Sequence, residues 1–329
     1  MTLKKSLLVL IFSALLVTFI MMPSLKGVNR AATDDQIAFS PDDSMKDLQV
    51  KIGKMREQIR RAGGTYDVGI NPAMQYPIEQ LCTANPDLAK VTSGVNPELV
   101  GQTLIPIDPI IIIPIFPSSY TGLCSFKPVQ NISTCTWNFV TCEAAEAAFY
   151  KKFGTVYNFS EQYVLDCNCS GYSCTGGGWL SFDTFVSCPT TCGTGVPLES
   201  GYYAYNGIKY TCEPCYPPTK YALAGYSQMC TGICSISSIK SAIQTYGMVT
   251  CAVTVTSYFQ AYTSGCFSYD TTSPVNHPII ICGWNDTTPC ATGGWRLKNS
   301  WSTAWGDGGY MWIKYGVSQI GTSATYCYR

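Results

Sequence analysis

Four short fragments of the sequence carry side chains that can do chemistry. In chain order they are Gln130-Asn131-Ile132-Ser133-Thr134-Cys135-Thr136-Trp137-Asn138-Phe139; Ser160-Glu161-Gln162, followed by Leu165-Asp166-Cys167 and Cys174-Thr175-Gly176-Gly177; Asn276-His277; and Lys298-Asn299-Ser300-Trp301, leading to Trp305-Gly306-Asp307-Gly308-Gly309-Tyr310. They supply thiols, side-chain amides and the only imidazole of the 329 residues. Such groups serve nucleophilic and general-base catalysis. A single histidine makes a zinc site a poor expectation, and neither metal nor cofactor is predicted.

The order and spacing of these fragments resemble the papain family of cysteine peptidases, over roughly residues 115–329. Each fragment alone is weak, but the set in this order is specific. The resemblance implies a thiolate at a helix N-terminus, stabilised by the helix dipole and a neighbouring imidazolium. The parent activity that it implies is hydrolysis of peptide bonds through an acyl-enzyme, in a cleft that receives a peptide or protein ligand.

The resemblance assigns a role to each matching residue. Gln130 corresponds to the oxyanion-hole amide, His277 to the base, and Asn299 to the amide that orients it. Trp301 would shield the hydrogen bond between His277 and Asn299. The pair Gly176-Gly177 would bind the substrate backbone.

The resemblance fails at the nucleophile. The family places this residue immediately before the tryptophan, where Thr136 stands, and the stretch from Gln130 to Trp137 keeps the family spacing. The family also has a cysteine three residues upstream of the nucleophile, bonded to the cysteine of the Cys-x-Gly-Gly segment. That upstream position is Ser133 here. Cys135 lies between the two expected positions.

Three interpretations of Cys135 and Thr136 stay open. Cys135 takes over the structural bond to Cys174, which leaves no nucleophile. Alternatively, Cys135 is a shifted nucleophile, although one residue along a helix turns a side chain by about 100° and rises ~1.5 Å, which near-attack geometry hardly tolerates. Or Thr136 attacks, with a hydroxyl that is barely ionised and a methyl that crowds the site. The sequence favours the first interpretation.

The preferred function is a catalytically inactive papain-family homologue that acts by peptide binding or protein assembly. Pro278 supports this reading, because the family usually has a small residue after the histidine and the proline ring would intrude on the substrate pocket. The alternative is an active endopeptidase with Cys135 as nucleophile, which the retention of His277 and Asn299 favours.

The N-terminus indicates export. Lys4 and Lys5 precede an uncharged apolar run, residues 6–22, that is longer than the ~7–15 residues of a signal-peptide core and only reaches the ~17–25 needed to span a bilayer. Residues 1–30 are therefore predicted as a signal peptide or a signal-anchor, and a membrane contact would run through residues 6–22. The chain is expected in the secretory pathway, as an extracellular, lysosome-like or lumenal protein.

Cysteines and sequons agree with export. Of the 18 cysteines, 17 lie between Cys124 and Cys327, a density typical of oxidising compartments. Those expected in disulfides include Cys135, Cys167, Cys174 and Cys212. Four Asn-x-Ser/Thr sequons predict glycosylation at Asn131, Asn158, Asn168 and Asn285.

Composition narrows the class of protein. With 21 basic and 21 acidic residues the chain has no net charge, so no cationic surface for nucleic acid is expected. Charged residues make up only 13% and hydrophobic residues 46%, which excludes a disordered chain.

The spacing of apolar residues predicts the helices and strands that position the candidate catalytic residues. Leu48, Ile52, Met55 and Ile59 recur at helical spacing within residues 42–61, with Asp42, Asp43 and Ser44 as N-cap candidates and Gly63-Gly64 as the stop. A loop is expected from there to about residue 100. Residues 31–114 thus form a pro-region-like or stem segment, a candidate surface for a protein complex, with one amphipathic helix instead of the family's long charged inhibitory pro-region.

The second half of the chain predicts an α+β, papain-like, two-lobed and disulfide-rich fold. Residues 137–152 are expected as a largely buried helix, and short β-branched runs after Tyr221 as strands: 249–255, 275–282, 295–298 and 309–314. The helical lobe would span about 115–222 and the β-barrel-like lobe about 223–329.

Overall fold

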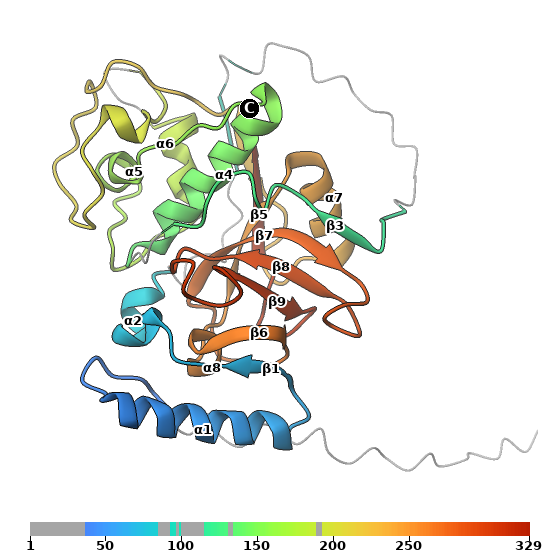
Figure 1. The fold of residues 1–329 in the computed structure, drawn as a ribbon. Helices are drawn as coiled ribbons and strands as arrows, with labels where there is room; N and C mark the ends of the chain where they lie inside the picture. The colour runs from blue at the N-terminus through green and yellow to red at the C-terminus, as the bar shows by residue number, and fades with distance from the viewer. Residues whose placement is uncertain (1–36, 85–92, 97–98, 100–114, 131–133, 189–192) are drawn as a thin grey trace, which may run out of the picture. The chain divides into compact units, whose positions relative to one another are not determined.

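The computed structural model describes residues 37–84, 93–96, 99, 115–130, 134–188 and 193–329, which belong to one unit that begins at Ile37 (Figure 1). The predicted signal segment, residues 1–30, lies outside the described residues. So does the apolar run at residues 6–22.

The unit is α+β. Its α-helices are α1 (Met45–Arg61), α2 (Ile78–Leu81), α4 (Thr136–Phe153), α5 (Glu161–Cys167), α6 (Asp183–Val186), α7 (Ile236–Tyr246) and α8 (Ser257–Gln260), with short 3-10 turns η1 (Pro72–Gln75), η3 (Trp179–Phe182) and η4 (Glu199–Gly201). Its strands are β1 (Thr65–Val68), β2 (Ser93–Val95), β3 (Ser119–Thr121), β4 (Gly225–Gln228), β5 (Val249–Val253), β6 (Tyr262–Phe267), β7 (His277–Asn285), β8 (Gly294–Lys298), β9 (Tyr310–Lys314) and β10 (Thr322–Tyr328).

The predicted N-terminal helix is confirmed as α1. Ser44 is its N-cap and forms a capping box with Asp47, which satisfies two backbone N–H groups at the helix start. Its apolar stripe buries Ile52, Met55 and Ile59. Gly63 follows the helix with a φ of 71°, a left-handed conformation that glycine adopts without steric cost.

The expected loop from residue 62 to about 100 is wrong in part. β1 pairs antiparallel with β6, so this stretch adds an edge strand to the main sheet. Asn71 caps η1 and its side-chain amide donates to the backbone oxygen of Gln260 at 2.9 Å, which ties η1 to α8. The alternation of exposed and buried residues in Thr65–Val68 covers only four positions, too few to be recognised as a strand from the sequence. The strand is stabilised by its pairing with β6.

The predicted buried helix is confirmed as α4. Fourteen of its 18 residues are buried, so it has no solvent face to give an amphipathic pattern. It ends at Gly154, whose φ of 68° places a left-handed residue at the helix C-terminus, and Lys151 and Lys152 lie in the last turn.

The strands of the described residues follow the path β1-β6-β9-β8-β7-β5-β10-β4-β2, with β3 beside β7. The four predicted strands are confirmed as β5, β7, β8 and β9. The sequence did not predict helix α7 or strands β4, β6 and β10. Figure 1 shows α4, α5 and α6 at the opposite end of this unit from α1 and β1.

Two hydrophobic cores confirm the two-lobed fold. One core surrounds α4 and α5, with Trp137 and Phe149 at its centre. The other fills the space enclosed by β5–β9 and includes Trp284, Trp301 and also Met55 of α1. Strand residues such as Ala252 and Ile280 belong to the core of the helical lobe, so β5 and β7 are shared between the lobes.

Six disulfides are formed by described cysteines, which confirms a disulfide-rich fold. The pairs are Cys124–Cys282, Cys135–Cys174, Cys167–Cys212, Cys169–Cys188, Cys230–Cys234 and Cys266–Cys290. The longest-range bond, Cys124–Cys282, joins the start of the helical lobe to β7 across 158 residues.

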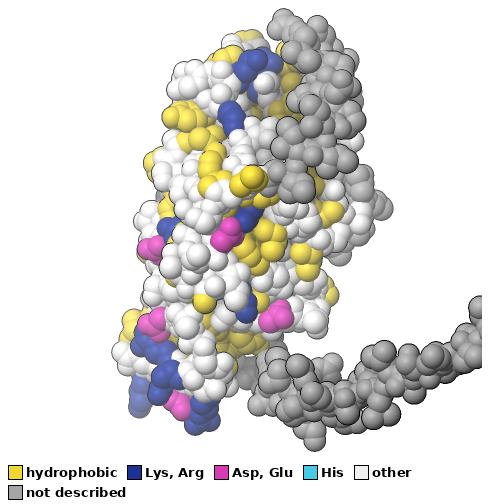
Figure 2. Space-filling view, turned by 90° about the vertical axis from the view of Figure 1, so that its right-hand side faces the viewer, with side chains coloured by type: hydrophobic (Ala, Val, Ile, Leu, Met, Phe, Trp, Pro, Cys, Tyr) yellow, Lys and Arg dark blue, Asp and Glu magenta, His cyan; other side chains and the backbone are white. Residues whose placement is uncertain are grey.

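The face shown in Figure 2 carries few charged side chains, and they gather most at the end where α1 lies. Within the described ranges, the helices are all too short or too polar to span a bilayer.

Candidate active site

Strand β7 and helix α4 bring the predicted site residues together from positions far apart in the sequence. His277 is the first residue of β7, and Asn299 directly follows β8, its neighbour in the sheet. Thr136 is the first residue of α4. All three side chains are buried.

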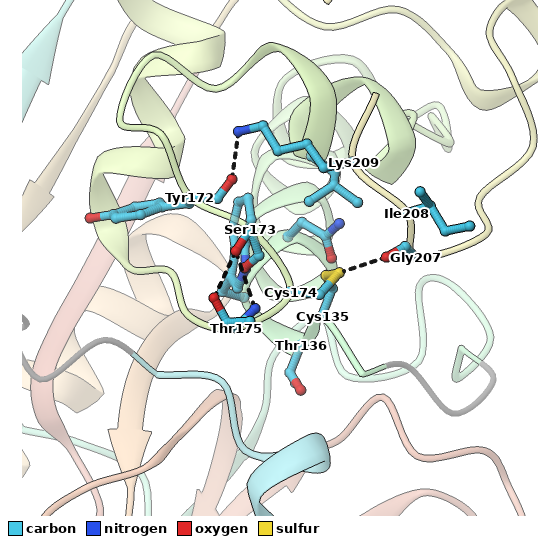
Figure 3. The surroundings of a disulfide bond; sticks show 12 residues. Cys135, Thr136, Tyr172, Ser173, Cys174, Thr175, Gly207, Ile208 and Lys209 are labelled. Atoms are coloured by element: carbon cyan, nitrogen blue, oxygen red, sulfur yellow. Dashed lines mark hydrogen bonds between the residues drawn. A yellow bond between two sulfur atoms is a disulfide. The ribbon is translucent and has the colours of Figure 1, made fainter. Parts of the chain in front are cut away.

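Cys135 is the N-cap residue of α4 and is bonded to Cys174, with Cα atoms 4.5 Å apart. Figure 3 shows this disulfide and the Thr136 side chain, which points away from it. The two neighbours therefore face different partners. In this arrangement the sulfur of Cys135 is not a thiol.

The hydroxyl of Thr136 donates a hydrogen bond to the carbonyl oxygen of Leu81, with Oγ1 and O 2.8 Å apart. Neither residue has any solvent exposure. Leu81 is the last residue of α2, so the N-terminal segment contacts the start of α4. The Thr136 proton is directed at a backbone carbonyl and not at the base.

His277 and Asn299 form the predicted pair. Nε2 of the imidazole lies 3.1 Å from Oδ1 of Asn299, and this oxygen also accepts the N–H of Ser300 at 2.9 Å. Because Oδ1 can only accept, Nε2 carries the proton, and Nδ1 is the basic nitrogen. Among the described residues Nδ1 has no hydrogen-bond partner that meets normal geometry.

The Trp301 ring covers the pair as the resemblance implied. Its centroid lies 4.8 Å from that of the imidazole, and the tryptophan is completely buried. Phe259 of α8 packs edge-on against both rings.

Burial lowers the pKa of His277 from 6.5 to about 4, an effect only partly opposed by the Asn299 side chain and the backbone of Leu81. The described residues place neither a carboxylate nor a thiolate beside it, so the imidazole is neutral at pH 7. This differs from the thiolate–imidazolium pair that the resemblance implied.

The segment Leu81–Ala84 runs along the residues expected to bind substrate backbone. The N–H of Gly177 donates to the oxygen of Thr83 at 3.0 Å, and the N–H of Ala84 donates to the oxygen of Asn276 at 3.1 Å. Ala84 and Gly177 form a parallel β-bridge. Gly177 therefore bonds to backbone of the same chain, and substrate binding by Gly176-Gly177 stays a prediction.

The sequence predicted residues 31–114 as a pro-region-like or stem segment with one amphipathic helix, and that assignment stays a prediction. Among its described residues α1 is the one long helix, and the short stretch at Thr83 and Ala84 bonds to the backbone of Gly177 and Asn276. The sequence pattern could not show this, because residues 81–84 have neither periodicity nor charge to mark them.

Gly177 is required for close packing. A Cβ at this position would collide with the indole ring of Trp137, whereas a Cβ at Gly176 would meet open space. The indole nitrogen of Trp137 donates to the oxygen of Ser173 at 2.9 Å, which fixes the ring under the glycine. The two glycines thus have different roles.

Gln130 is linked to the site through its backbone. Its backbone oxygen accepts the N–H of Ser302 at 2.9 Å, which brings it next to the loop that follows Asn299. Pro278 is buried in β7 opposite Ala252. The oxyanion role of Gln130 and the pocket-blocking role of Pro278 stay predictions.

A buried charge network beside the site was not singled out from the sequence. Nζ of Lys127 lies 2.7 Å from both carboxylate oxygens of Glu146, and Nζ of Lys298 lies 2.5 Å from Glu143. Burial raises the pKa of Glu146 to about 7 and that of Glu161 to about 8. The sequence feature that could have revealed this network is the pair Glu143 and Glu146 within the otherwise largely apolar helix α4.

The predicted disulfide cysteines are all bonded: Cys135 to Cys174 and Cys167 to Cys212.

Of the sequons, Asn131 lies outside the described residues, Asn158 is exposed and Asn285 is half-buried. Asn168 conflicts with the prediction. It is only 7% exposed, and its amide nitrogen donates to three backbone oxygens, those of Val164, Leu165 and Tyr172. A glycan there is incompatible with this packing.

In the part of the chain that the structure describes, no cluster of three or more His, Cys, Asp or Glu side chains could hold a metal ion.

Comparison with known proteins agrees with the geometry. The chain is 32% identical over 196 residues to fruit bromelain of Ananas comosus, a match that covers 58% of this chain and 52% of the relative. It is 28% identical over 210 residues to pro-cathepsin H of Mus musculus, covering 61% and 56%. The chain thus spans only about half the length of these relatives.

The fold also resembles that of digestive procathepsin L 3 from the larval midgut of Tenebrio molitor, with a TM-score of 0.67, 23% identity, and coverage of 86% of this chain and 90% of the other. The model of the family described as papain family cysteine protease matches residues 120–328. Together with the His277–Asn299 pair and the two-lobed fold, this match shows that the chain belongs to the papain family of cysteine proteases.

Proposed function

We propose that this chain is a papain-family homologue without peptidase activity, which acts by peptide binding in its cleft or by assembly with other proteins. The observation that carries the proposal is the bond between Cys135 and Cys174 next to Thr136. It leaves a threonine hydroxyl as the only candidate nucleophile at the start of α4. That hydroxyl is engaged by Leu81, not by His277.

We also propose that the protein resides in the secretory pathway, and several features support this location. Six disulfides among the described residues suit an oxidising compartment. The apolar run at residues 6–22 would serve as signal or membrane anchor. Glycosylation at Asn131, Asn158 and Asn285 belongs to the same proposal. Residues 31–114 are the proposed surface for a protein complex.

A second candidate, an active endopeptidase that uses Cys135, is favoured by the intact His277–Asn299 pair. For that enzyme the Cys135 bond would have to be reduced, and its side chain would have to turn toward Nδ1 of His277.

The experiment treats the full chain with a thiol-directed epoxide, measures hydrolysis of a peptide library, and maps disulfides without reduction. We expect no hydrolysis, no label on Cys135, and recovery of the Cys135–Cys174 peptide. The positive control is Thr136→Cys, which places a thiol at the family position, and its label should disappear in Thr136→Cys/His277→Ala.

Hydrolysis by the wild-type chain would overturn the proposal. If that activity is lost in Cys135→Ala, the shifted-nucleophile enzyme replaces it. If it is lost only in Thr136→Val, a threonine peptidase replaces it.

A further inference from the structure

We propose that Tyr246 and Tyr326 form a site of oxidative modification, at which a one-electron oxidant joins the two phenol rings through a carbon–carbon bond. Tyr246 is the last residue of α7, and Tyr326 lies in β10. The cross-link would tie the C-terminal end of α7 to the strand between β5 and β4. This inference does not depend on whether the chain hydrolyses peptides.

The two rings are stacked on each other. Their centroids lie 4.0 Å apart, and their planes differ by only 4°. The rings come from a helix and a strand that pack together, so regular structure holds both of them. The ring carbons that must bond therefore start close to van der Waals contact in a fixed orientation, which is the condition under which proximity speeds an intramolecular step.

The two phenol groups are adjacent as well. A hydrogen bond joins the side chains of Tyr246 and Tyr326, and burial, with Tyr326 beside it, raises the pKa of Tyr246 to about 12. In parallel rings whose hydroxyls meet, the carbons next to the hydroxyls also face each other. These carbons carry unpaired electron density in a phenoxyl radical, so the reactive positions are the ones in contact.

Coupling needs two one-electron oxidations. Each phenol gives up one electron and its O–H proton and becomes a phenoxyl radical. The radicals bond at the carbons next to the oxygens, and the protons released from these carbons return to the oxygens. The protein loses two hydrogen atoms in total. With a haem peroxidase as oxidant, one hydrogen peroxide is reduced to two waters, a reaction that suits the oxidising surroundings in which disulfides persist.

Access of the oxidant favours this pair over other stacked tyrosines. Tyr246 and Tyr326 are both half-buried, and a cavity of about 220 Å³ adjoins Tyr246. In the part of the chain that the structure describes, the other stacked tyrosine pair is Tyr258 and Tyr269, with centroids 4.6 Å apart and planes at 14°. Tyr258 is only 9% exposed, and its hydroxyl donates to Gln58. That pair is both farther apart and more shielded.

Tyr328 provides a control within the same cluster. It lies two residues after Tyr326 in β10, on the same face of the strand, and it lines the same cavity as Tyr246. Its centroid is 6.2 Å from that of Tyr246 and 6.3 Å from that of Tyr326, with the planes tilted by 37° and 38°. Tyr328 therefore meets the oxidant without being in position to couple.

The test exposes the dilute full chain to hydrogen peroxide and a haem peroxidase, measures the dityrosine fluorescence of the monomer, and maps linked peptides by mass spectrometry. We expect the monomer to lose the mass of two hydrogen atoms and to give one linked peptide, between Tyr246 and Tyr326. Tyr246→Phe and Tyr326→Phe keep a stacked ring but lack a phenol, so each should lower the monomer fluorescence at least about tenfold. Tyr328→Phe is the matched control and should stay within about twofold of wild type.

Two results would overturn the proposal. One is a linked peptide in the monomer that joins Tyr258 to Tyr269, or that contains Tyr328, in place of the expected one. The other is an unmodified monomer under conditions that couple free tyrosine, because the fixed stacking would then give no advantage. Equal fluorescence in wild type and Tyr246→Phe counts as the first result, since the coupling would lie elsewhere.

Discussion

Two adjacent residues at the start of α4 have different partners. Cys135 faces Cys174 and Thr136 faces Leu81, so the disulfide and the cleft contact are made by adjacent residues. The N-cap residue of α4 is thus covalently bound to the loop at Cys174, while the first helical residue contacts the end of α2.

At the same scale, His277 predicts acid sensitivity. Its pKa in the folded protein, about 4, lies below the ordinary value of 6.5, so the unfolded chain binds the proton more tightly. The resulting stabilisation is complete above pH 6.5 and is lost as the pH falls from 6.5 toward 4. The loss from this group is about 3 kcal/mol. Urea unfolding at pH 7 and pH 4 should therefore show a smaller loss for His277→Gln, which keeps an N–H for Asn299.

Equal losses for wild type and His277→Gln would contradict this origin of acid sensitivity. The raised pKa values of Glu146 and Glu161 act in the opposite direction, since their contribution is lost as the pH rises. They are common to both variants and do not affect the difference.

Adjacent glycines offer a second residue-scale prediction. Gly177→Ala should destabilise the protein by about 1–3 kcal/mol, because the new methyl group overpacks against Trp137. Gly176→Ala is the matched control, with open space around its Cβ, and should change stability by less than about 0.5 kcal/mol. Thermal unfolding of both variants measures the difference. A similar cost for both would show that Trp137 does not limit this position.

Among the elements, α1 holds the N-terminal segment on the β lobe. Met55 is completely buried and belongs to the same core as Trp284 and Trp301, although α1 lies far from both in sequence. The helix therefore acts as an outer layer of the β lobe. Its apolar stripe was visible in the sequence, but its partner was not.

Met55→Ala should weaken this docking by about 2–5 kcal/mol, because it leaves a cavity under the helix. Exchange of the β1 amides should speed up, while that of the β8 amides should not. Val50→Ala on the same helix is the control, since Val50 is 50% exposed and its truncation removes little buried surface. Faster exchange in β8 as well would mean that α1 is part of the global folding unit.

For the molecule as a whole, the two lobes share buried charges as well as strands. Lys298 of β8 donates to the backbone oxygen of Lys127 at 2.7 Å and pairs with Glu143 of α4. Lys127 in turn pairs with Glu146 of α4. This network joins the helical lobe to the sheet, and each charge depends on its partner because water does not reach them.

Lys127→Met should therefore destabilise the whole protein by about 3–5 kcal/mol, since it leaves Glu146 buried without a counter-charge. Arg56→Met is the matched control. Its partner is Asp67, both side chains are about half exposed, and such pairs contribute about 0–1 kcal/mol. Chemical unfolding followed by tryptophan fluorescence compares the two. A cost below about 1 kcal/mol for Lys127→Met would show that Glu146 takes up a proton without penalty.

The sequence by itself determined the family, the helix over residues 137–152, four strands of the β lobe, and the residues that meet as His277, Asn299 and Trp301. The helix and strands rest on the local periodicity of apolar residues, and the family and site residues rest on the order of four short motifs. It also left Cys135 and Thr136 with several open roles, because spacing along a chain does not say which way adjacent side chains point.

Only the tertiary structure decided the roles of residues 65–84 and of the two glycines. β1 exists because β6 offers it an edge, and Thr83 and Ala84 are held in place because Gly177 and Asn276 bond their backbone. Gly177 matters because the Trp137 ring lies against it. Each of these outcomes depends on a partner at least 40 residues away, so no local pattern could carry the information.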